Sequence, residues 1–208
     1  MEHILDLYQR PYHEQQPVVC VDEKSKQLIA EVREPLPMEP GLPLRYDSHY
    51  ERRGTANVFL AFEPLRNWRG TQVTERRTGV DFAHFIRWLA DEIYPEAAII
   101  HLVVDNLNTH KPAVLYEAFP AAEAHRLAQR LQFHYTPKHG SWLNIAEIEL
   151  SVLSRQALAD RMPDKETLAR EVTAWEHERN HVGATIDWRF TTDDARIKLK
   201  RLYPSFDT

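Results

Sequence analysis

Two aspartates each follow an apolar run of the kind that forms a buried strand. Asp22 ends "PVVCVD", residues 17–22, and Asp105 lies near the end of "AAIIHLVVDN", residues 97–106. In an open sheet, ligands gather beside the carboxyl ends of the central strands. If the two strands are neighbours, these carboxylates lie side by side and could share a cation.

Two further carboxylates, Glu147 and Glu149, occur in "TPKHGSWLNIAEIELSVLSRQ", residues 136–156, where apolar residues recur with helical spacing. The helical wheel has one stripe of Leu143, Ala146, Leu150, Leu153 and Ala157 and an opposite cluster of Ile145, Ile148 and Val152. This pattern predicts a helix that is buried from two sides. The two glutamates fall on the two borders of the leucine and alanine stripe, so periodicity does not decide which of them faces the sheet. Because a buried carboxylate is costly unless it is paired or bound to a cation, we expect at least one to have a partner.

Three carboxylates without a cysteine ligand suit a hard cation such as Mg²⁺ or Mn²⁺, which also takes phosphate oxygens as ligands. Two such ions are a common arrangement for phosphoryl transfer. The chain has 31 acidic residues, however, so a set of unrelated surface acids is the alternative interpretation of composition alone.

The first half of the chain predicts three strands and a helix. The first strand covers 17–22, and the runs 57–65 and 71–78 flank the turn-like "RNWRG", which predicts a hairpin. Between them, the proline-rich segment 33–54 is incompatible with a helix and predicts an extended excursion or flap. An amphipathic helix follows, with Asp81 as its N-cap and a stop at Pro95.

The second half alternates strands with helices. The run that ends at Asp105 predicts a central strand, 121–131 a helix and 132–136 a short strand. After the glutamate-bearing helix, one more helix runs from the cap Asp164 to a stop near Gly183, and the last begins near 192–193. The order predicts an α/β fold with a mixed five-stranded sheet, helices on both faces and extra C-terminal helices.

Composition is that of a soluble globular protein of 208 residues, with no secretory signal and no apolar run long enough to cross a membrane. The single cysteine, Cys20, is interpreted as a small buried residue, so we expect a cytoplasmic protein without disulfides. A net charge of −5 does not indicate nucleic-acid binding by itself. Basic residues do cluster at 52–53, 76–77 and 196–201, although each cluster alone is more typical of a solvated face.

The motifs "VCVDE", "VVDNLNTH" and "PKHGSWLNIAEIE" resemble the catalytic domain of DDE transposases of the mariner-type superfamily, and most of all its bacterial insertion-sequence branch. The resemblance implies an RNase H-like fold with Asp22, Asp105 and Glu147 as the catalytic, metal-binding triad, since "LNIAE" matches the family pattern of asparagine, two small or apolar residues and acid. The spacing between the last two acids exceeds that of the eukaryotic mariner branch, and the helical stretch 113–130 accounts for the difference.

The resemblance covers nearly the whole chain, from about Pro17 to "DARIKLKRLYP". We therefore expect residues 17–208 to form an RNase H-like DDE catalytic domain and residues 1–16 to be a leader or the remnant of an interdomain linker. The N-terminal helix-turn-helix modules that read transposon ends in full-length members are absent from this sequence.

The activity implied by the resemblance is that of a DDE transposase, a DNA endonuclease and strand transferase that uses Mg²⁺ or Mn²⁺, with two ions expected. Water cleaves the phosphodiester to free a 3′-OH at the transposon end, and that hydroxyl then attacks target DNA. The implied partners are transposon ends, target DNA and a second copy of the chain, with no membrane and no small-molecule substrate. The implied location is the bacterial cytoplasm, in association with the nucleoid.

Several polar residues near the acids are candidates for contacts with DNA phosphates: Asn106, Asn108, His110, Lys138, His139, Arg76 and Arg77. The side-chain donors that follow Asp105 could orient a carboxylate or touch a phosphate, but asparagines that only fix a turn are an equal alternative. A solvated loop is the alternative for the residues before the glutamate helix. We expect Trp142 to pack under the site and not to stack on a base.

A different chemistry is suggested by "HERNH", residues 177–181, which fits the H-E-x-x-H pattern of zinc proteases. A third ligand would normally follow, yet no histidine or glutamate occurs after His181, and only an aspartate such as Asp187 could substitute. Coincidence is the preferred interpretation. Two closer alternatives share the acid triad: a host RNase H-like nuclease without strand transfer, and an inactive remnant that serves in dimerisation or DNA binding.

Overall fold

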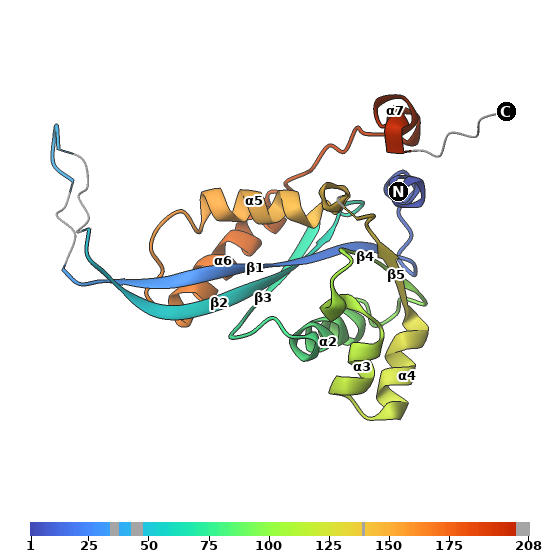
Figure 1. Cartoon of the computed structure of the whole chain (residues 1–208), viewed down its shortest axis with the longest axis horizontal. Coiled ribbons are helices and arrows are strands. Elements are labelled where there is room, and N and C mark those ends of the chain that lie inside the picture. Colours follow the sequence, from blue (N-terminus) through green and yellow to red (C-terminus); the bar gives the residue numbers. More distant parts are fainter. Residues whose placement is uncertain (34–37, 43–47, 139, 203–208) are drawn as a thin grey trace.

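The structure is a computed structural model that describes residues 1–33, 38–42, 48–138 and 140–202. Five strands form one sheet in the order β3-β2-β1-β4-β5 (Figure 1). Their bounds are β1 Val18–Glu31, β2 Tyr50–Glu63, β3 Trp68–Thr74, β4 Ile100–Val104 and β5 Leu131–Tyr135. The first three strands are antiparallel, whereas β4 pairs parallel to β1 and β5 parallel to β4. The predicted mixed sheet of five strands is confirmed.

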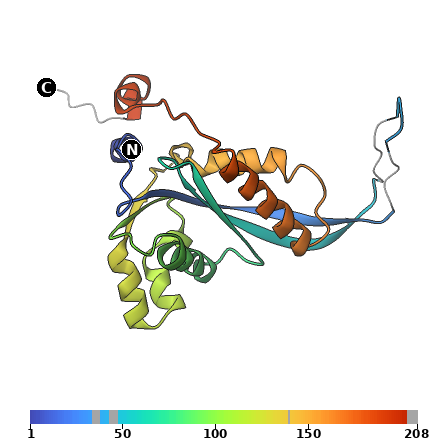
Figure 2. The ribbon, with the colours of Figure 1, turned by 180° about the vertical axis from the view of Figure 1, so that it is seen from behind.

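Helices cover both faces of the sheet, as predicted (Figures 1 and 2). The α-helices are α1 Glu2–Tyr8, α2 Gly79–Trp88, α3 Ala113–Ala118, α4 Ala121–Arg130, α5 Ala146–Gln156, α6 Lys165–His181 and α7 Thr192–Lys198. A π-helical turn, Leu89–Ile93, extends α2, and 3-10 turns occur at Asn108–His110, Ser141–Leu143 and Lys200–Leu202.

Alternation along β1 assigns its side chains to two separate cores. Val19 and Val21 pack with the apolar residues of α2, α3 and α4. Cys20 lies on the other face with Leu150 and Leu153 of α5. Because side chains alternate along a strand, Asp22 belongs to the face that α5 covers.

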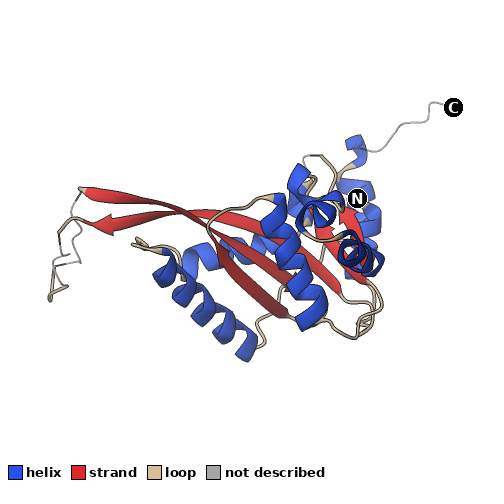
Figure 3. Ribbon diagram, turned by 90° about the horizontal axis from the view of Figure 1, so that it is seen from below, coloured by secondary structure: helices blue, strands red, loops and turns tan. Residues whose placement is uncertain are grey.

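The strands β1 and β2 are much longer than the sequence predicted, since β1 continues from Asp22 to Glu31 and β2 begins at Tyr50. Together they extend beyond the helices as a two-stranded arm (Figure 3). Part of the expected flap at 33–54 thus belongs to β2, while 34–37 and 43–47 lie outside the described residues.

Side-chain caps define where two helices start. Asp164 accepts a hydrogen bond from the Thr167 backbone and caps α6 as predicted. The prediction for α2 was wrong by one turn, because Thr78 is the N-cap and Asp81 lies at the third helical position, where it completes a capping box. The extended backbone of Thr78 lets its hydroxyl accept from the Asp81 backbone N–H, which an N-cap at Asp81 could not do.

The helix that carries the two glutamates covers the sheet with one side only. Leu150 and Leu153 are buried against β1 and β2, but Ile148 is 37% exposed and Val152 is half-buried. The predicted burial from two sides is therefore wrong at Ile148. Of the isoleucine and valine cluster of the wheel, Ile145 is fully buried in the core and Val152 packs against it, and only Ile148 is exposed.

Residues 1–16, expected to be a leader or linker remnant, include the packed helix α1. Ile4, Leu5 and Leu7 are buried in the core on the α5 side of the sheet. The Tyr8 hydroxyl donates to the Leu143 carbonyl at 2.7 Å. The same hydroxyl lies 3.2 Å from the sulfur of Cys20, and burial raises the pKa of that thiol to about 12. Helix α1 thus helps to position the turn that leads into α5.

Candidate active site

The sheet brings Asp22 and Asp105 to the same place. In the parallel pairing of β1 with β4, Val18 lies opposite His101 and Cys20 opposite Val103. Extending this register by two residues places Asp22 opposite Asp105, immediately after β4 ends. The two acids are therefore neighbours, although Asp22 lies within β1 and only Asp105 follows the end of its strand.

Glu147 joins them because the start of α5 is fixed to β1. The Asn144 amide nitrogen donates to the carbonyl of Val21 at 2.9 Å, and its amide oxygen accepts from the Ala146 backbone N–H at 3.2 Å. Both interactions are buried, and Asn144 itself has no exposed surface. The first turn of α5 is thus held against the residue that precedes Asp22, and Glu147 lies in that turn.

The three carboxylates influence one another electrostatically. Burial raises the pKa of Asp22 to about 7; the hydrogen bond from the Glu23 backbone opposes this rise, and the charges of Glu23, Asp105 and Glu147 add to it. Within the described residues the Glu147 carboxylate makes no hydrogen bond or ion pair, and no group of three or more His, Cys, Asp or Glu side chains is arranged so that it could hold a metal ion. The three acids border one site whose negative charge is not neutralised at Asp22 or Glu147. Crowded carboxylate oxygens without a counter-charge are a donor set that fits a hard divalent cation.

His110 connects two acids at the back of this site. It is fully buried, with Nδ1 2.5 Å from Asp105 Oδ1 and Nε2 3.0 Å from Glu23 Oε2. Burial favours the neutral imidazole, but the two carboxylates outweigh it and raise the pKa of His110 to about 9. The side chain also packs on the ring of Phe82, with centroids 4.5 Å apart. His110 is thus in ion-pair contact with both acids, although its Nδ1 makes no hydrogen bond of regular geometry to Asp105.

Glu23 is the part of this arrangement that the sequence did not predict. It directly follows Asp22, so alternation turns its side chain to the opposite face of β1. Its partner His110 is 87 residues away in the sequence. No local pattern could have indicated that contact.

The other residues that were predicted to contact phosphates differ in their surroundings. Asn106, Asn108 and Lys138 are exposed, and the Asn108 amide oxygen accepts from Lys111. The turn after Asp105 is fixed by the Asp105 carboxylate, which accepts from the Leu107 backbone, and not by an asparagine side chain. His139 lies outside the described residues.

Two of the candidate phosphate-contacting residues, Arg76 and Arg77, follow β3. Arg77 is exposed and its guanidinium lies 3.8 Å from Glu23, while Arg76 is exposed with no ion pair among the described residues. Trp142 was expected to pack under the site; it stacks on Trp188 and contacts Phe190 edge-on, and it remains 40% exposed.

Glu149 is excluded from the acid site by two arginines. Arg69, which is fully buried on β3, donates to both carboxylate oxygens at 2.8 Å, and Arg179 of α6 donates to the same oxygens at 3.1 and 2.8 Å. Burial favours protonation of Glu149, but these hydrogen bonds prevail and lower its pKa. We call Arg69, Glu149 and Arg179 the arginine clamp. The clamp joins β3, α5 and α6, and it leaves Glu147 as the glutamate available for chemistry.

The histidines of "HERNH" do not form a site. His177 and His181 are exposed on α6, and the described part of the chain has no third ligand beside them. The residues between them have structural contacts instead, since Arg179 belongs to the clamp and Asn180 pairs with the Arg69 backbone in both directions. The residues of the pattern thus have packing contacts in α6, and coincidence remains the preferred interpretation.

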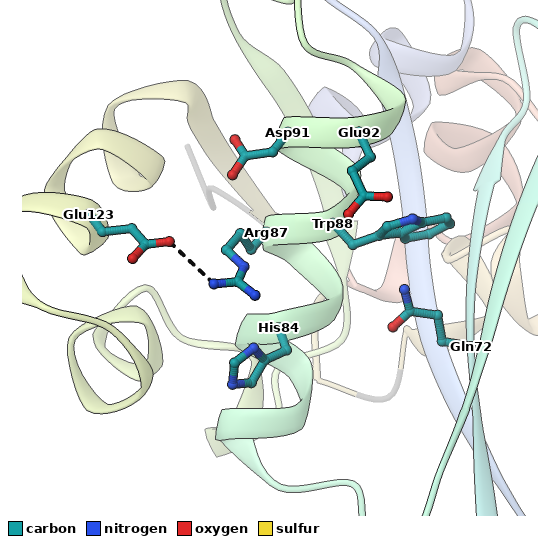
Figure 4. A pocket seen from close by; sticks show the side chains of 7 residues that line it. All are labelled: Gln72, His84, Arg87, Trp88, Asp91, Glu92 and Glu123. Carbon is teal, nitrogen blue, oxygen red and sulfur yellow. Dashed lines mark hydrogen bonds and ion pairs between the residues drawn. The ribbon is translucent and has the colours of Figure 1, made fainter.

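A surface pocket lies away from the acids, between α2, α4 and β3 (Figure 4). Its cavity volume is about 460 Å³, and an ion pair between Arg87 and Glu123 bridges its two helices. None of the three candidate acids lines it. The candidate chemistry is thus at the strand ends and not in this cavity.

Comparisons with known proteins agree with the fold. Residues 17–169 match the model of the family described as DDE superfamily endonuclease. The chain belongs to that family. No curated protein matches the sequence.

One solved structure shows the same RNase H-like fold. The strand transfer complex of Mos1 aligns over 85% of this chain with a TM-score of 0.54 and 15% identity. A Mos1 mariner paired-end complex with Mn aligns over 89% of this chain, with 14% identity and a TM-score of 0.35. The match covers 51% of the first of these chains, so this chain spans about half the length of that solved transposase.

Proposed function

We propose that this chain is the catalytic domain of a transposase of the mariner-type superfamily, most similar to its bacterial insertion-sequence branch. The observation that supports the proposal is that Asp22 on β1 lies in register with Asp105, which follows the adjacent strand β4, and that Glu147 begins a helix anchored beside them. Membership of an endonuclease family supports hydrolysis of a phosphodiester as the chemistry.

In this proposal Asp22, Asp105 and Glu147 hold Mg²⁺ or Mn²⁺, with two ions expected. A bound divalent cation would lower the pKa of a water nucleophile and offset the charge of the phosphate. The chain itself fixes the geometry. Asn144 sets the distance between the first and third acids, and His110 keeps the Asp105 carboxylate from rotating away. Such positioning is the main contribution of a protein to in-line displacement at phosphorus.

The proposed partners are transposon ends and target DNA, and a second copy of the chain is expected because two ends must be handled together. The solved relatives are a strand transfer complex and paired-end complexes of Mos1, which motivates the extension from cleavage to strand transfer. No described helix is long and apolar enough to cross a membrane. The proposed place of action is bacterial DNA in the cytoplasm.

A host nuclease that cleaves without strand transfer would use the same three acids. The two functions differ in what happens to the new 3′-OH. Incubating a pre-nicked duplex with a supercoiled target and the divalent cation separates them, because only a strand transferase gives covalently joined products. An inactive remnant would bind neither metal nor substrate productively.

The test of the proposal is metal-dependent nicking of a short DNA duplex at low salt. Wild type is compared with Asp105→Ala and with the double variant His177→Ala/His181→Ala in Mg²⁺ or Mn²⁺. We expect wild type and the double variant to cleave and Asp105→Ala to be inactive. Equal cleavage by Asp105→Ala, or loss of cleavage in the double variant alone, would reject the carboxylate site.

A further inference from the structure

A strip of polar side chains leads away from the acids between β1 and α5. The two elements run side by side in the same direction: Asn144, just before α5, donates to the carbonyl of Val21 within β1, and the ammonium of Lys26 donates to the Leu158 carbonyl at 2.7 Å just after α5. An extended polymer with one end at the acids could therefore lie along both β1 and α5.

Lys24 is the first basic side chain on the strand side. Alternation places it on the same face of β1 as Asp22, about 7 Å farther along the strand. Its cross-strand partner, Val58, is buried beneath α5, whereas Lys24 is exposed. The parallel pairing with β4 ends before this point, so Lys24 emerges at an edge of β1 that no described strand covers between Glu23 and Gln27.

The two lysines on this face have different surroundings. Lys26 is held by the carbonyls of Leu158 and Asp160, which gives it a structural role. Lys24 makes no hydrogen bond or ion pair with any described residue. Its ammonium is thus free to meet a ligand, and it lies between the carboxylate of Asp22 and the fixed ammonium of Lys26 on the same face.

Arg155 is the corresponding residue on the helix side. Residues four apart share one face of a helix, so Glu147, Ser151 and Arg155 form a single stripe. Arg155 is exposed and donates to the Ser151 hydroxyl at 2.6 Å. It lies about 12 Å from Glu147 along the helix axis, a length of roughly three to four base-pair steps of B-DNA. We call Asp22, Lys24, Glu147, Ser151 and Arg155 the β1–α5 strip.

We propose that the β1–α5 strip binds one strand of DNA, with Lys24 and Arg155 each contacting a backbone phosphate beside the scissile position. The inference rests on the proposed function, because the acids fix where the scissile phosphate lies. A phosphodiester backbone fits the strip, since it has one negative charge per nucleotide and needs cationic contacts beyond a metal-binding end. Such contacts are independent of base sequence.

The test measures binding of a short labelled duplex by fluorescence anisotropy over a range of salt concentrations. We expect Lys24→Ala and Arg155→Ala each to make the slope of log Kobs against log[salt] less steep by about 0.9, the value for one lost phosphate contact. Lys24→Arg retains the charge and should restore the slope. Two unrelated duplex sequences should be weakened equally.

Matched controls remove surface charges elsewhere. Lys198→Ala on α7 removes a lysine that pairs with Asp194, and Arg170→Ala on α6 removes an arginine that is 68% exposed. Both should leave the slope unchanged. The proposal would be overturned by an unaltered slope in both Lys24→Ala and Arg155→Ala. It would also be overturned by an equally large change of slope in the controls, or by absence of DNA binding by wild type.

Mn²⁺ binding by calorimetry, measured on the same proteins without DNA, separates the two proposals. The strip variants should bind Mn²⁺ like wild type, because neither residue is a metal ligand. If wild type binds no Mn²⁺ but the salt slopes change as expected, the DNA surface stands and the catalytic function fails. If Mn²⁺ binds and the slopes do not change, the function stands and the strip fails.

Discussion

Glu147 and Glu149 lie two residues apart on α5 and meet opposite surroundings. Glu149 is fully buried and neutralised by two arginines, whereas Glu147 lies beside two other acids without a cationic partner among the described residues. In the arginine clamp, two guanidinium groups offset the charge of a buried carboxylate whose role is structural. Carboxylates that remain uncompensated destabilise the folded chain on their own, and this cost is typical of a site prepared for an external cation.

The largest expected effect comes from breaking the clamp. Arg69→Ala leaves a buried carboxylate with one partner fewer and should lower the free energy of unfolding by about 3–5 kcal/mol, as measured by urea denaturation. Arg126→Ala is the matched control, because Arg126 and Asp91 form a similar two-bond pair on the surface. That change should cost less than about 1 kcal/mol. Equal losses in the two variants would contradict the distinction between buried and exposed pairs.

The next effect concerns the acid site. His110→Gln removes the charge that holds Asp105 and should lower the rate of metal-dependent cleavage by about 10- to 100-fold, the usual effect of an outer-shell partner. Circular dichroism and a thermal melt check that the fold is retained. A variant that is folded and cleaves at the wild-type rate would show that His110 does not position Asp105.

A smaller effect is expected for Asp22, where substitution should raise the free energy of unfolding, whereas Arg69→Ala should lower it. Because the pKa of Asp22 in the folded chain is about 7 and its ordinary value is near 4, the folded state binds the proton more tightly. Without metal, stability should therefore fall as the pH rises from about 4 through 7. Asp22→Asn cannot ionise, so in EDTA it should be more stable than wild type by the order of 1–2 kcal/mol at pH 8 and similar near pH 4. A variant that is less stable than wild type at pH 8 would indicate that Asp22 has a partner.

The smallest effect is predicted for the histidines of "HERNH". His177→Ala/His181→Ala should change the free energy of unfolding by no more than about 0.5 kcal/mol, since both side chains are exposed. Thermal melts with and without Zn²⁺ measure this. A Zn²⁺-dependent rise in melting temperature that the double variant abolishes would show that the motif binds metal.

The parts of the fold that depend on local pattern could be predicted from the sequence. Apolar runs that end in Asp22 and Asp105 indicated central strands, and Asp164 indicated the start of a helix. Asp81 was placed wrongly because a threonine three residues earlier takes the capping position, a competition between neighbouring polar residues that spacing alone does not resolve.

The finer features of the site depend on contacts between distant segments. The helical wheel treats Glu147 and Glu149 alike; the resemblance to transposases selected Glu147, and the structure explains the choice through Arg69, which is 80 residues from Glu149. The pairing of His110 with Glu23 spans 87 residues. Lys24 was missed because its exposure depends on where β4 ends and where α5 lies, and neither is a property of the surrounding sequence.

The most direct test of the central claim is calorimetric titration of Mn²⁺ into wild type, Glu147→Gln and the exposed control Glu178→Gln on α6. The account predicts that wild type and Glu178→Gln bind alike and that Glu147→Gln binds at least about 10-fold more weakly, since it loses a charged oxygen ligand. Unchanged Mn²⁺ affinity in Glu147→Gln would contradict the claim that Glu147 completes the acid site with Asp22 and Asp105.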